Sequence, residues 1–563
     1  MIAPLDCIVV GYNDPPFERY ERLIRNYGVD SEAYRDLRYS FVDLHGRRLN
    51  YVDLLNYADA AARGAAPGSR RFESGEIPNL AAVYLTNFLR QHGLRAGYIN
   101  LFQQEKARFR ELLEQGPAVV AITTTFYILN FPVNEIVEFV REHSPRTTIV
   151  VGGPLIGNHL RTAQEGGQPY ADAMGLVQSD RLRAALDDLS ADAYVIDPQG
   201  ERTLVDIVSR AREGRDLSGV PNLLVKQHGR YRRTMVSPEN NPMDHVYIHW
   251  DEFAGDPLGP TLQTRTARSC AFSCAFCSYP ERAGNLALAG VDTVEREFDA
   301  MRDLGTRNVV FIDDTFNVPL ARFKDLCRLL IRKRYGFRWF SYFRCSNADA
   351  EAFDLMAEAG CTGVFLGIES GSPTILKNMH KAARIEQYVS GIAELKARGI
   401  LTFGSFILGF PGETAETIRE TRDFIRTTGL DYYRTQMWYY EHGTPIARER
   451  EKYRMEGEGF VWQHATMESM EAMDHIDRIF FEIDGARWLP QWSFDFWFIP
   501  YALGKGITLE QFGRFVDGAN RMLALDVASV PEGRKAHGKE DAFRAIVDVA
   551  RDWSLAGEAR TPA

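Results

Sequence analysis

Two series of short apolar runs, with helix-like segments between the runs, constrain the fold of this chain more than any other feature. In the first series the runs cover residues 6–11, 97–101, 118–124, 147–152 and 191–196. Strands that alternate with helices form parallel sheets with helices on both faces. We therefore expect a doubly wound α/β domain over residues 1–225, with its ligand site at the carboxyl ends of the strands. Residues 12–75 are too long for a normal connection and are expected to form an insertion.

The second series begins after residue 258. Its six apolar runs cover residues 262–265, 308–312, 339–344, 362–368, 402–408 and 432–438. Six βα units over about 180 residues suit a partial, TIM-like (βα)6 barrel better than a closed eight-stranded one. We expect a linker at 226–258, the barrel at 259–446, and a mainly helical, aromatic-rich domain at 447–563.

Charge and hydropathy exclude several classes of protein. The chain has 66 Lys and Arg against 76 Asp and Glu, a net charge of −10, whereas dedicated nucleic-acid binders usually carry a basic excess. No run approaches the roughly 18–20 apolar residues of a membrane span. The first residues lack the basic and apolar regions of a signal peptide. We therefore expect a cytoplasmic protein without nucleic-acid or membrane partners.

Three of the seven cysteines fall within eight residues, at Cys270, Cys274 and Cys277, in a C-x3-C-x2-C pattern. An odd, sparse set of cysteines is not a disulfide framework. Cysteine thiolates are the standard ligands of iron–sulfur clusters, and three of them leave one iron of a four-iron cube open for a substrate or cofactor. A structural zinc site would need a fourth ligand. The spacing therefore predicts a 4Fe–4S cluster, whereas Cys327, Cys345 and Cys361 are expected to be core residues.

A C-x3-C-x-aromatic-C motif after the first strand of a (βα)6 unit resembles the radical SAM superfamily, with Phe276 at the aromatic position. The resemblance implies that the cluster binds S-adenosyl-L-methionine (SAM). It assigns the SAM methionine end to Asp313 and Asp314, its carboxylate to Arg344, and its ribose to Glu369 and Ser370. The fifth strand reaches Leu408 and a G-x-P-G-E-T turn, and the sixth leads to His442 before G-T-P. Read as structure alone, the aspartates are a strand-end turn and the G-x-P-G-E-T segment is a helix cap.

The first domain resembles that of the cobalamin-dependent class, in residues 77–81, 151–154 and 200–203. The resemblance implies a Rossmann-like cobalamin-binding domain. The residues expected around the cofactor and its nucleotide tail are Thr123, Thr124, Thr125, Gly152, Gly153, Pro154, Gly200 and Glu201. The competing interpretation is that the glycines are plain turns and the threonines plain strand residues.

One departure concerns the lower face of cobalt. Cobalamin domains that ligate cobalt through histidine carry Asp-x-His-x-x-Gly after the first strand, and this chain has Gly11-Tyr12-Asn13-Asp14 there. No histidine is therefore expected to ligate cobalt, and Tyr12 and Asn13 are the candidates for that face.

A wider resemblance, in residues 6–17, 34–37, 79–85 and 123–127, is to the PhpK-type P-methyltransferases and the thiopeptide tryptophan C-methylases. It implies a cobalamin-dependent radical SAM methyltransferase that works through methylcobalamin and a 5′-deoxyadenosyl radical. The acceptor would be an unactivated carbon or a phosphinate phosphorus of a small-molecule or peptide natural-product precursor. The cluster would need an external one-electron reductant of the flavodoxin or ferredoxin type.

Three other functions stay open on the sequence. They are a non-radical methylase of the same architecture, a cobalamin-dependent radical SAM enzyme that rearranges or cyclises its substrate, and a sensor that binds the cofactors without turnover. His442 and His464 are candidate proton-transfer groups, although a lone histidine is more often structural. The aromatic C-terminal region is either a lid over the substrate or an ordinary helical cap.

Overall fold

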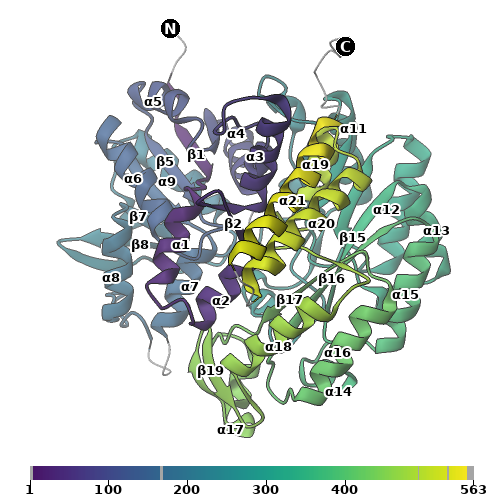
Figure 1. The fold of residues 1–563 in the computed structure, drawn as a ribbon. Helices are drawn as coiled ribbons and strands as arrows, with labels where there is room; N and C mark the ends of the chain where they lie inside the picture. Colours follow the sequence, from purple (N-terminus) through teal and green to yellow (C-terminus); the bar gives the residue numbers. More distant parts are fainter. Residues whose placement is uncertain (1–3, 165–168, 492–493, 529–531, 554–563) are drawn as a thin grey trace. The chain divides into compact units, whose positions relative to one another are not determined.

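The computed structural model describes residues 4–164, 169–491, 494–528 and 532–553, and the chain divides into two compact units (Figure 1). The first unit comprises Met1–Pro15, Gly75–Leu258 and Glu281–Ala300. The second comprises Pro16–Ser74, Gly259–Pro280 and Met301–Ala563. None of the helices in the described part of the chain combines the length and apolar character that a bilayer span requires.

The first unit is built on a seven-stranded sheet. In spatial order its strands are β4 (Ala96–Leu101), β1 (Cys7–Tyr12), β5 (Val119–Thr123), β6 (Thr148–Gly152), β7 (Ala193–Val195), β8 (Leu223–Gln227) and β9 (Arg230–Arg233). The first five are parallel. Every residue of β5 is buried, as expected for a strand with helices on both faces. The sheet confirms the doubly wound fold and puts its topological switch point between β1 and β5.

Helices connect and cover these strands. They are α4 (Leu80–Gln91), α5 (Lys106–Glu114), α6 (Phe131–His143), α7 (Pro154–Ala163), α8 (Asp180–Leu189) and α9 (Glu201–Arg212). The five predicted strands form, with helices between them as the sequence predicts. Helix α11 (Val291–Asp303) also belongs to the first unit, although its sequence lies within the predicted barrel.

The sheet continues into the segment predicted to be a linker. Strands β8 and β9 form an antiparallel hairpin whose turn residues, His228 and Gly229, both have positive φ, of 49° and 77°. Positive φ at both positions is the geometry of a two-residue hairpin turn. Charged residues such as Lys226 of β8 and Arg232 of β9 interrupt the apolar pattern. Strand β9 is at the edge of the sheet, where charge protects a strand from further pairing. That is why the sequence pattern did not reveal these strands.

The second unit contains the barrel. Its strands are β10 (Thr261–Thr264), β13 (Asn308–Phe311), β14 (Arg338–Tyr342), β15 (Cys361–Glu369), β16 (Leu401–Leu408), β17 (Tyr432–Met437) and the short β21 (Arg487–Trp488). They are parallel and lie side by side in chain order. Helices α12 (Leu320–Lys333), α13 (Ala350–Glu358), α15 (Ile385–Ala397) and α16 (Ala415–Thr428) alternate with them (Figure 1). The six predicted βα units are therefore confirmed.

The region after the barrel is mainly helical, with α17 (Arg450–Tyr453), α18 (Ser469–Glu482), α19 (Phe498–Lys505), α20 (Leu509–Val527) and α21 (Glu532–Arg551). It also holds a small antiparallel sheet that the sequence did not predict. The strands of this sheet are β18 (Glu456–Glu458), β19 (Val461–His464) and β20 (Met467–Glu468). Trp492, one of the aromatic residues of this region, lies outside the described residues.

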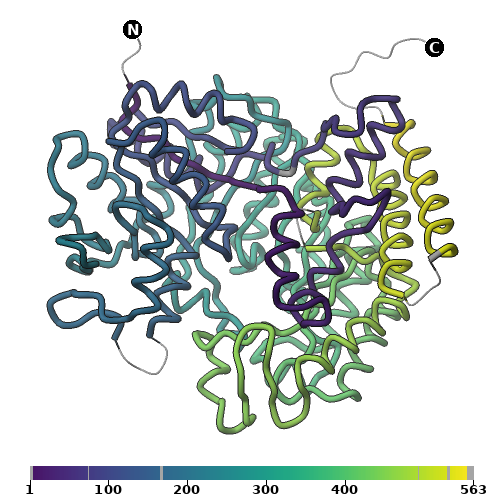
Figure 2. The backbone as a smooth tube through the Cα atoms, turned by 60° about the vertical axis from the view of Figure 1, so that its left-hand side comes forward, coloured from purple at the N-terminus to yellow at the C-terminus, as the bar shows by residue number. Residues whose placement is uncertain are grey.

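Most of the predicted insertion belongs to the second unit rather than to the first sheet. Its elements are α1 (Phe17–Arg25), α2 (Glu32–Arg38), β2 (Phe41–Leu44), β3 (Arg47–Asn50) and α3 (Tyr51–Arg63). Figure 2 shows this purple segment beside the yellow helices α20 and α21, against which α3 packs. The contact joins segments more than 450 residues apart, so no local pattern could reveal it.

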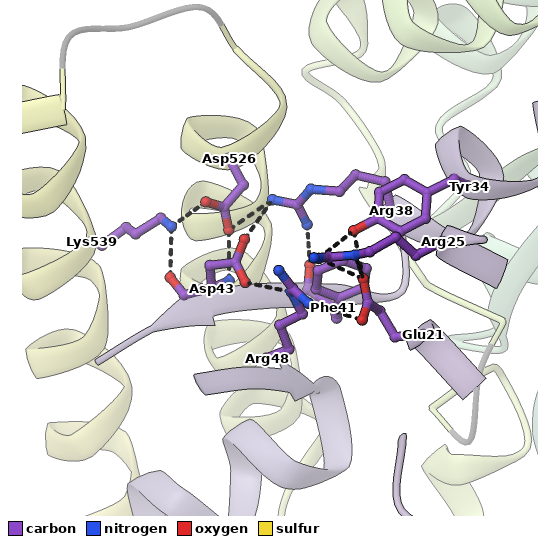
Figure 3. Close-up of polar contacts among 9 residues, drawn as sticks. All are labelled: Glu21, Arg25, Tyr34, Arg38, Phe41, Asp43, Arg48, Asp526 and Lys539. Atoms are coloured by element: carbon purple, nitrogen blue, oxygen red, sulfur yellow. Dashed lines mark hydrogen bonds and ion pairs between the residues drawn. The ribbon is translucent and has the colours of Figure 1, made fainter. Parts of the chain in front are cut away.

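A buried charge cluster fastens the insertion to these helices (Figure 3). The Asp526 carboxylate of α20 pairs with Lys539 of α21 and, at 3.1 Å, with Arg38 of α2, and it accepts a hydrogen bond from the Asp43 backbone N–H at 2.9 Å. The Asp526 side chain is 2% exposed. Buried charges are tolerated when they are paired in this way, and Asp526 is the carboxylate that the two cations share.

We expect Asp526→Asn to lower the free energy of unfolding by about 3 kcal/mol, because it leaves Lys539 buried without a counter-charge and leaves Arg38 with only the Asp43 carboxylate, at 3.7 Å. Urea denaturation followed by tryptophan fluorescence measures the effect. Arg544→Ala is the matched control on α21, because Arg544 pairs only with exposed Asp541 and its side chain is 69% exposed. That control should change stability by less than about 0.5 kcal/mol. Equal midpoints for Asp526→Asn and the wild type would contradict the role of the cluster.

Candidate functional site

The candidate residues of the second unit lie where barrel strands end, except His464, which lies in β19. The cysteine loop follows β10, the two aspartates follow β13, and Arg344 follows β14. Glu369 ends β15, Leu408 ends β16, and His442 follows β17. Because the strands are parallel and consecutive, their carboxyl ends share one edge, which is where barrels of this type build their sites.

The three cysteines of the loop come together. Cys274 is 7% exposed, and Cys270 and Cys277 are half-buried. Burial raises the pKa of the Cys277 thiol, and the neighbouring thiols of Cys274 and Cys270 raise it further. Among the described residues no three Cys, His, Asp or Glu side chains surround a single metal ion. In an iron–sulfur cube each of the three thiolates would bind a different iron.

Two buried cations stand beside Cys274. Burial raises the pKa of the Cys274 thiol, and Lys381 and Arg344 oppose that rise. The Arg344 guanidinium lies 3.6 Å from the centroid of the Phe272 ring, and its buried Nη2 has no hydrogen-bond partner. A buried guanidinium nitrogen without a partner fits an incoming carboxylate. The prediction that Arg344 serves an anion is therefore compatible with its surroundings.

Glu369 does not stand free, because it forms a buried ion pair with Lys381. Lys381 Nζ lies 3.0 Å from Glu369 Oε1, and their side chains are 9% and 10% exposed. Lys381 also lies over the Phe276 ring, 5.6 Å from its centroid. Burial alone would lower the pKa of Lys381, but Glu369, Tyr388 and Cys274 together raise it above its usual value, so the ammonium stays charged. A Cβ at Gly367 would lie 2.6 Å from Glu369 Oε1, so the glycine leaves room for the pair.

Sequence reasoning missed Lys381. It follows α14 (Pro373–Asn378) and lies 12 residues after its partner Glu369. No motif or spacing rule connects the two positions. The one indication in the sequence that Lys381 belongs to the site is its place shortly after the candidate residues Glu369 and Ser370.

Asp313 has a structural role at the start of the cysteine loop. Its carboxylate accepts hydrogen bonds from the Thr266 backbone N–H at 2.6 Å, the Thr266 hydroxyl at 2.5 Å and the Ala267 backbone N–H at 3.1 Å. Burial raises the pKa of Asp313. Burial and the Asp313 carboxylate raise the pKa of neighbouring Asp314 to about 7. Asp313 therefore holds the chain that leads from β10 to the cysteines, and Asp314 is the better placed of the two to meet a ligand.

Ser370 and Leu408 also make internal contacts. The Ser370 hydroxyl lies 3.1 Å from the Thr421 hydroxyl and accepts a hydrogen bond from the Ser372 backbone N–H. Leu408 is fully buried, and its carbonyl accepts a 2.7 Å hydrogen bond from the Trp438 backbone N–H. Both residues order the strand ends, and neither presents a polar side chain to a ligand.

The two candidate histidines differ. His442 is half-buried and packs on the Tyr440 ring at 4.6 Å. His464 stacks on Trp462 at 5.3 Å, and its Nε2 lies 3.1 Å from the Gly409 carbonyl. Burial lowers the pKa of His464. A neutral, stacked imidazole that hydrogen-bonds a backbone carbonyl is a structural residue, so His442 is the more accessible candidate.

In the first unit, the predicted residues line the carboxyl ends of β1, β5 and β6. The Tyr12 ring packs edge-on against Phe126 at 5.4 Å. Phe126 and Ile128, in the loop after β5, are 59% and 70% exposed, and Thr125 beside them is also exposed. These exposed apolar side chains stand at the switch point, where sheets of this kind bind ligands.

Threonine and glycine at the β5 and β6 ends form a tight junction. Thr124 Oγ1 donates to the Gly152 carbonyl at 2.8 Å and accepts from the Leu155 backbone N–H. The Thr123 hydroxyl donates to the backbone of β1. Gly153 has a φ of 106°, and a Cβ there would lie 2.9 Å from Thr124 Oγ1. Only glycine suits that position, and Gly153 and Pro154 remain exposed at the first turn of α7.

Other predicted cobalamin contacts already have protein partners. The Asn13 side chain donates to the Pro132 carbonyl and to Glu135, and accepts from Gln103. Glu201 is buried and accepts a hydrogen bond from Asn241 at 2.9 Å. Neither polar group is therefore available to a ligand in this structure.

The start of α9, after Gly200, is also occupied. The Glu239 carboxylate accepts hydrogen bonds from the backbone N–H groups of Arg202 and Thr203, both at 2.8 Å. A carboxylate at a helix N-terminus satisfies the free N–H groups and complements the helix dipole. This helix start, next to two of the predicted cobalamin residues, is therefore closed by the chain itself.

Comparison with known proteins finds a family match within the barrel part of the chain. Residues 264–425 match the Radical SAM superfamily. This chain contains a radical SAM domain. The match begins at the last residue of β10 and ends within α16, so it covers the cysteine loop, Arg344 and Glu369.

Curated relatives cover only parts of the chain. An uncharacterized methyltransferase of Pyrococcus horikoshii is 29% identical over 44% of this chain and 57% of its own length. A tryptophan 2-C-methyltransferase of Streptomyces laurentii is 31% identical over 28% of this chain and 29% of its own. The anaerobic magnesium-protoporphyrin IX monomethyl ester cyclase of Rubrivivax gelatinosus is 24% identical over 51% and 54%. The chain thus spans less than two thirds of each of these relatives.

Solved structures extend the likeness to most of the chain. The radical S-adenosylmethionine methyltransferase TsrM from Kitasatospora setae, with cobalamin and a 4Fe–4S cluster bound, has a TM-score of 0.58 at 17% identity, over 84% of this chain and 97% of that one. The cobalamin-dependent S-adenosylmethionine radical enzyme OxsB has a TM-score of 0.54 at 14% identity, over 85% and 83%. At these identities the matches show a shared fold.

Cys274→Ala should lose most of the iron of the protein, because the remaining two thiols cannot hold a four-iron cube. The wild type, purified anaerobically, should carry about four irons per chain. Cys361→Ala is the matched control, since Cys361 is a buried thiol at the start of β15, and it should retain the wild-type iron content. Full iron in Cys274→Ala would contradict the cluster assignment.

Glu413, in the G-x-P-G-E-T turn, gives a pH-dependent prediction. It is fully buried, accepts hydrogen bonds from the backbone N–H groups of Gly409 and Phe410, and leaves Oε1 without a partner. Burial raises its pKa to about 8. A carboxyl whose folded pKa exceeds its unfolded value of about 4.3 costs stability as the pH rises through that interval.

We therefore expect Glu413→Gln to gain stability relative to the wild type as the pH rises from about 4.3 to 8, because glutamine mimics the neutral acid. Melting temperatures of both proteins across this interval test the prediction. A difference that does not change with pH, or that shrinks as the pH rises, would show that Glu413 is ionised in the folded protein.

Proposed function

We propose that this protein is a cobalamin-dependent radical SAM methyltransferase that methylates a carbon or a phosphinate phosphorus of a natural-product precursor. The observation that carries the proposal is the three-thiol loop beside an unpartnered Arg344 nitrogen and the Lys381–Glu369 pair, at the carboxyl edge of a six-stranded parallel sheet. The likeness to TsrM and OxsB, whose structures contain cobalamin, and to methyltransferases of known sequence supports it.

The residues of the second unit fit a cluster and SAM. Cys270, Cys274 and Cys277 would hold the cluster, and the cations Lys381 and Arg344 favour the thiolate form that iron requires. Arg344 Nη2 would meet the SAM carboxylate, and Asp314 is placed for its ammonium. Glu369 would face the ribose hydroxyls. One of its carboxylate oxygens, Oε1, is already paired with Lys381. When bound, the reduced cluster would supply the electron that cleaves SAM, and cobalamin would carry the methyl group.

The residues of the first unit fit a flat, largely apolar cofactor. Tyr12, Phe126 and Ile128 offer aromatic and aliphatic surface at the switch point, and Gly153 and Pro154 leave the start of α7 open. The phosphate of a nucleotide tail suits the positive end of a helix dipole, and the exposed start of α7 would supply that dipole although its Leu155 N–H already binds Thr124, whereas Glu239 closes α9. The segment directly after β1, Asn13-Asp14-Pro15-Pro16, contains no histidine. The proposal therefore gives cobalt no histidine ligand from that position.

A non-radical C-methylase of the tryptophan type is the second candidate. The similarity to the tryptophan 2-C-methyltransferase of Streptomyces laurentii favours it. Both candidates share the same protein scaffold, and they differ in whether SAM is cleaved to a radical or serves only as a methyl donor. Either would need an external one-electron reductant to keep the cofactors active.

Turnover with methyl-labelled SAM and a one-electron reductant tests the proposal. We expect S-adenosylhomocysteine to form, dependent on added cobalamin, because the methyl group must leave SAM before it reaches the acceptor. Release of 5′-deoxyadenosine together with labelled product indicates the radical route, and labelled product without it indicates the second candidate. 5′-Deoxyadenosine without any S-adenosylhomocysteine would contradict methyl transfer. Cys274→Ala is the inactive control.

A further inference from the structure

The inner face of the barrel sheet can be followed through its register. Tyr342 of β14 pairs with Phe365 of β15, and Phe365 pairs with Phe403 of β16. Farther along the strands, Gly367 pairs with Ser405, and Ser405 pairs with Arg434 of β17. Paired residues of neighbouring strands share a face of the sheet. Arg434 therefore shares the face that carries the aromatic layer, and its neighbours in the same row are small.

Part of this face of β15 is accessible to solvent. Phe365 and Gly367 of β15 retain solvent-accessible surface, whereas Leu366 and Ile368, which point to the opposite face, are fully buried. Trp497 stacks parallel to Phe365 at 6.0 Å and contacts Tyr342 at 4.7 Å. These three rings form an aromatic wall on the inner face.

Arg434 is buried without satisfying its guanidinium. The residue is 6% exposed, and both its Nε and its Nη1 lack a hydrogen-bond partner. A buried charged donor without a partner costs several kcal/mol in general, so proteins keep one where a ligand completes it. Neither the proposed cluster ligands nor the proposed SAM contacts include Arg434.

Two carboxylates lie near Arg434 without touching it. Burial lowers the pKa of Arg434, and Asp36 of α2 and Asp495, just before α19, oppose that fall. Within the described part of the chain, neither carboxylate forms an ion pair with Arg434 at 4.0 Å or less. Asp495 accepts a hydrogen bond from the Trp497 backbone N–H at 3.0 Å, which fixes its position beside the aromatic wall. The Arg434 guanidinium and the carboxylates of Asp36 and Asp495 are therefore neighbours that form no direct ion pair.

We propose that Arg434, Asp36 and Asp495 form the subsite that recognises the ammonium and carboxylate groups of an amino-acid substrate. Arg434 would hold the carboxylate through a guanidinium N–H that has no protein partner, and Asp36 and Asp495 would hold the ammonium. A simple anion fits less well, because the two carboxylates would repel it, and a simple cation would leave Arg434 unsatisfied. The aromatic wall of Tyr342, Phe365 and Trp497 would receive the side chain. The inference rests on the proposed function, since it makes this amino acid the methyl acceptor.

Binding can be tested without turnover. Thermal unfolding of the full-length, cluster-loaded protein is measured with each of the twenty proteinogenic L-amino acids. At least one should raise the melting temperature. For the amino acid with the largest shift, the N-acetyl derivative and the methyl ester are then compared with the parent by calorimetry. Each derivative should bind about 30-fold or more weakly, because each removes one charge that a buried partner recognises.

Variants assign the two charges to residues. Arg434→Gln should abolish the shift, Arg434→Lys should keep part of it, and Asp36→Asn should weaken binding of the parent but not of its N-acetyl derivative. Arg487→Gln is the matched control, because Arg487 lies on neighbouring β21 and its side chain pairs with exposed Asp517. It should bind the amino acid like the wild type. SAM affinity should be unchanged in Arg434→Gln.

Three results overturn the inference. They are no shift with any of the twenty amino acids, undiminished binding by both derivatives, and a parallel loss of SAM affinity in Arg434→Gln, which would place Arg434 in the SAM site. The outcome is independent of the proposed reaction. Amino-acid binding without methyl transfer would support the subsite and refute the reaction, and methyl transfer without amino-acid binding would do the opposite.

Discussion

The parallel pairing of six consecutive strands, β10 to β17, is the constraint on which the candidate site depends. Hydrogen-bonded in chain order, the strands bring six carboxyl ends to one edge although the sequence separates them by more than 170 residues. The sheet brings the cysteine loop, Arg344 and Glu369 to this edge although they are far apart in the sequence. Asp313 completes the arrangement by tying the end of β13 to the chain that leaves β10.

Buried charge is the second determinant of the site, and partners balance it. Desolvation disfavours a thiolate at Cys274, and the neighbouring ammonium and guanidinium groups work against that penalty. Lys381 is kept charged by Glu369, so the cation persists although it is buried. The same principle holds outside the site, where Asp526 neutralises Arg38 and Lys539. Arg434, like Arg344, keeps buried guanidinium nitrogens without a hydrogen-bond partner, which makes both of them positions for a ligand.

Sequence patterns predicted the periodic parts of the molecule and the clustered motif. The strands of both sheets were readable because central parallel strands are continuous apolar runs, as in β5 and β16. The cysteine spacing is local and therefore visible. The features that the sequence did not predict depend on contacts between residues that are distant in sequence. Lys381 beside Glu369, Glu239 at the start of α9, and α3 against α21 follow from the folded chain alone. The β8–β9 hairpin was missed because charged residues interrupt its apolar pattern, most of all in the edge strand β9.

The central claim is that one chain holds both an iron–sulfur cluster and cobalamin. The most direct test is an iron and cobalt assay, with a visible absorption spectrum, on protein purified anaerobically after expression with cobalamin supplied. The account predicts about four irons and one cobalt per chain, with the spectrum of cobalamin that lacks a nitrogenous lower ligand. Iron without cobalt would leave a radical SAM enzyme whose first unit serves another ligand, and it would contradict the methyl-transfer assignment.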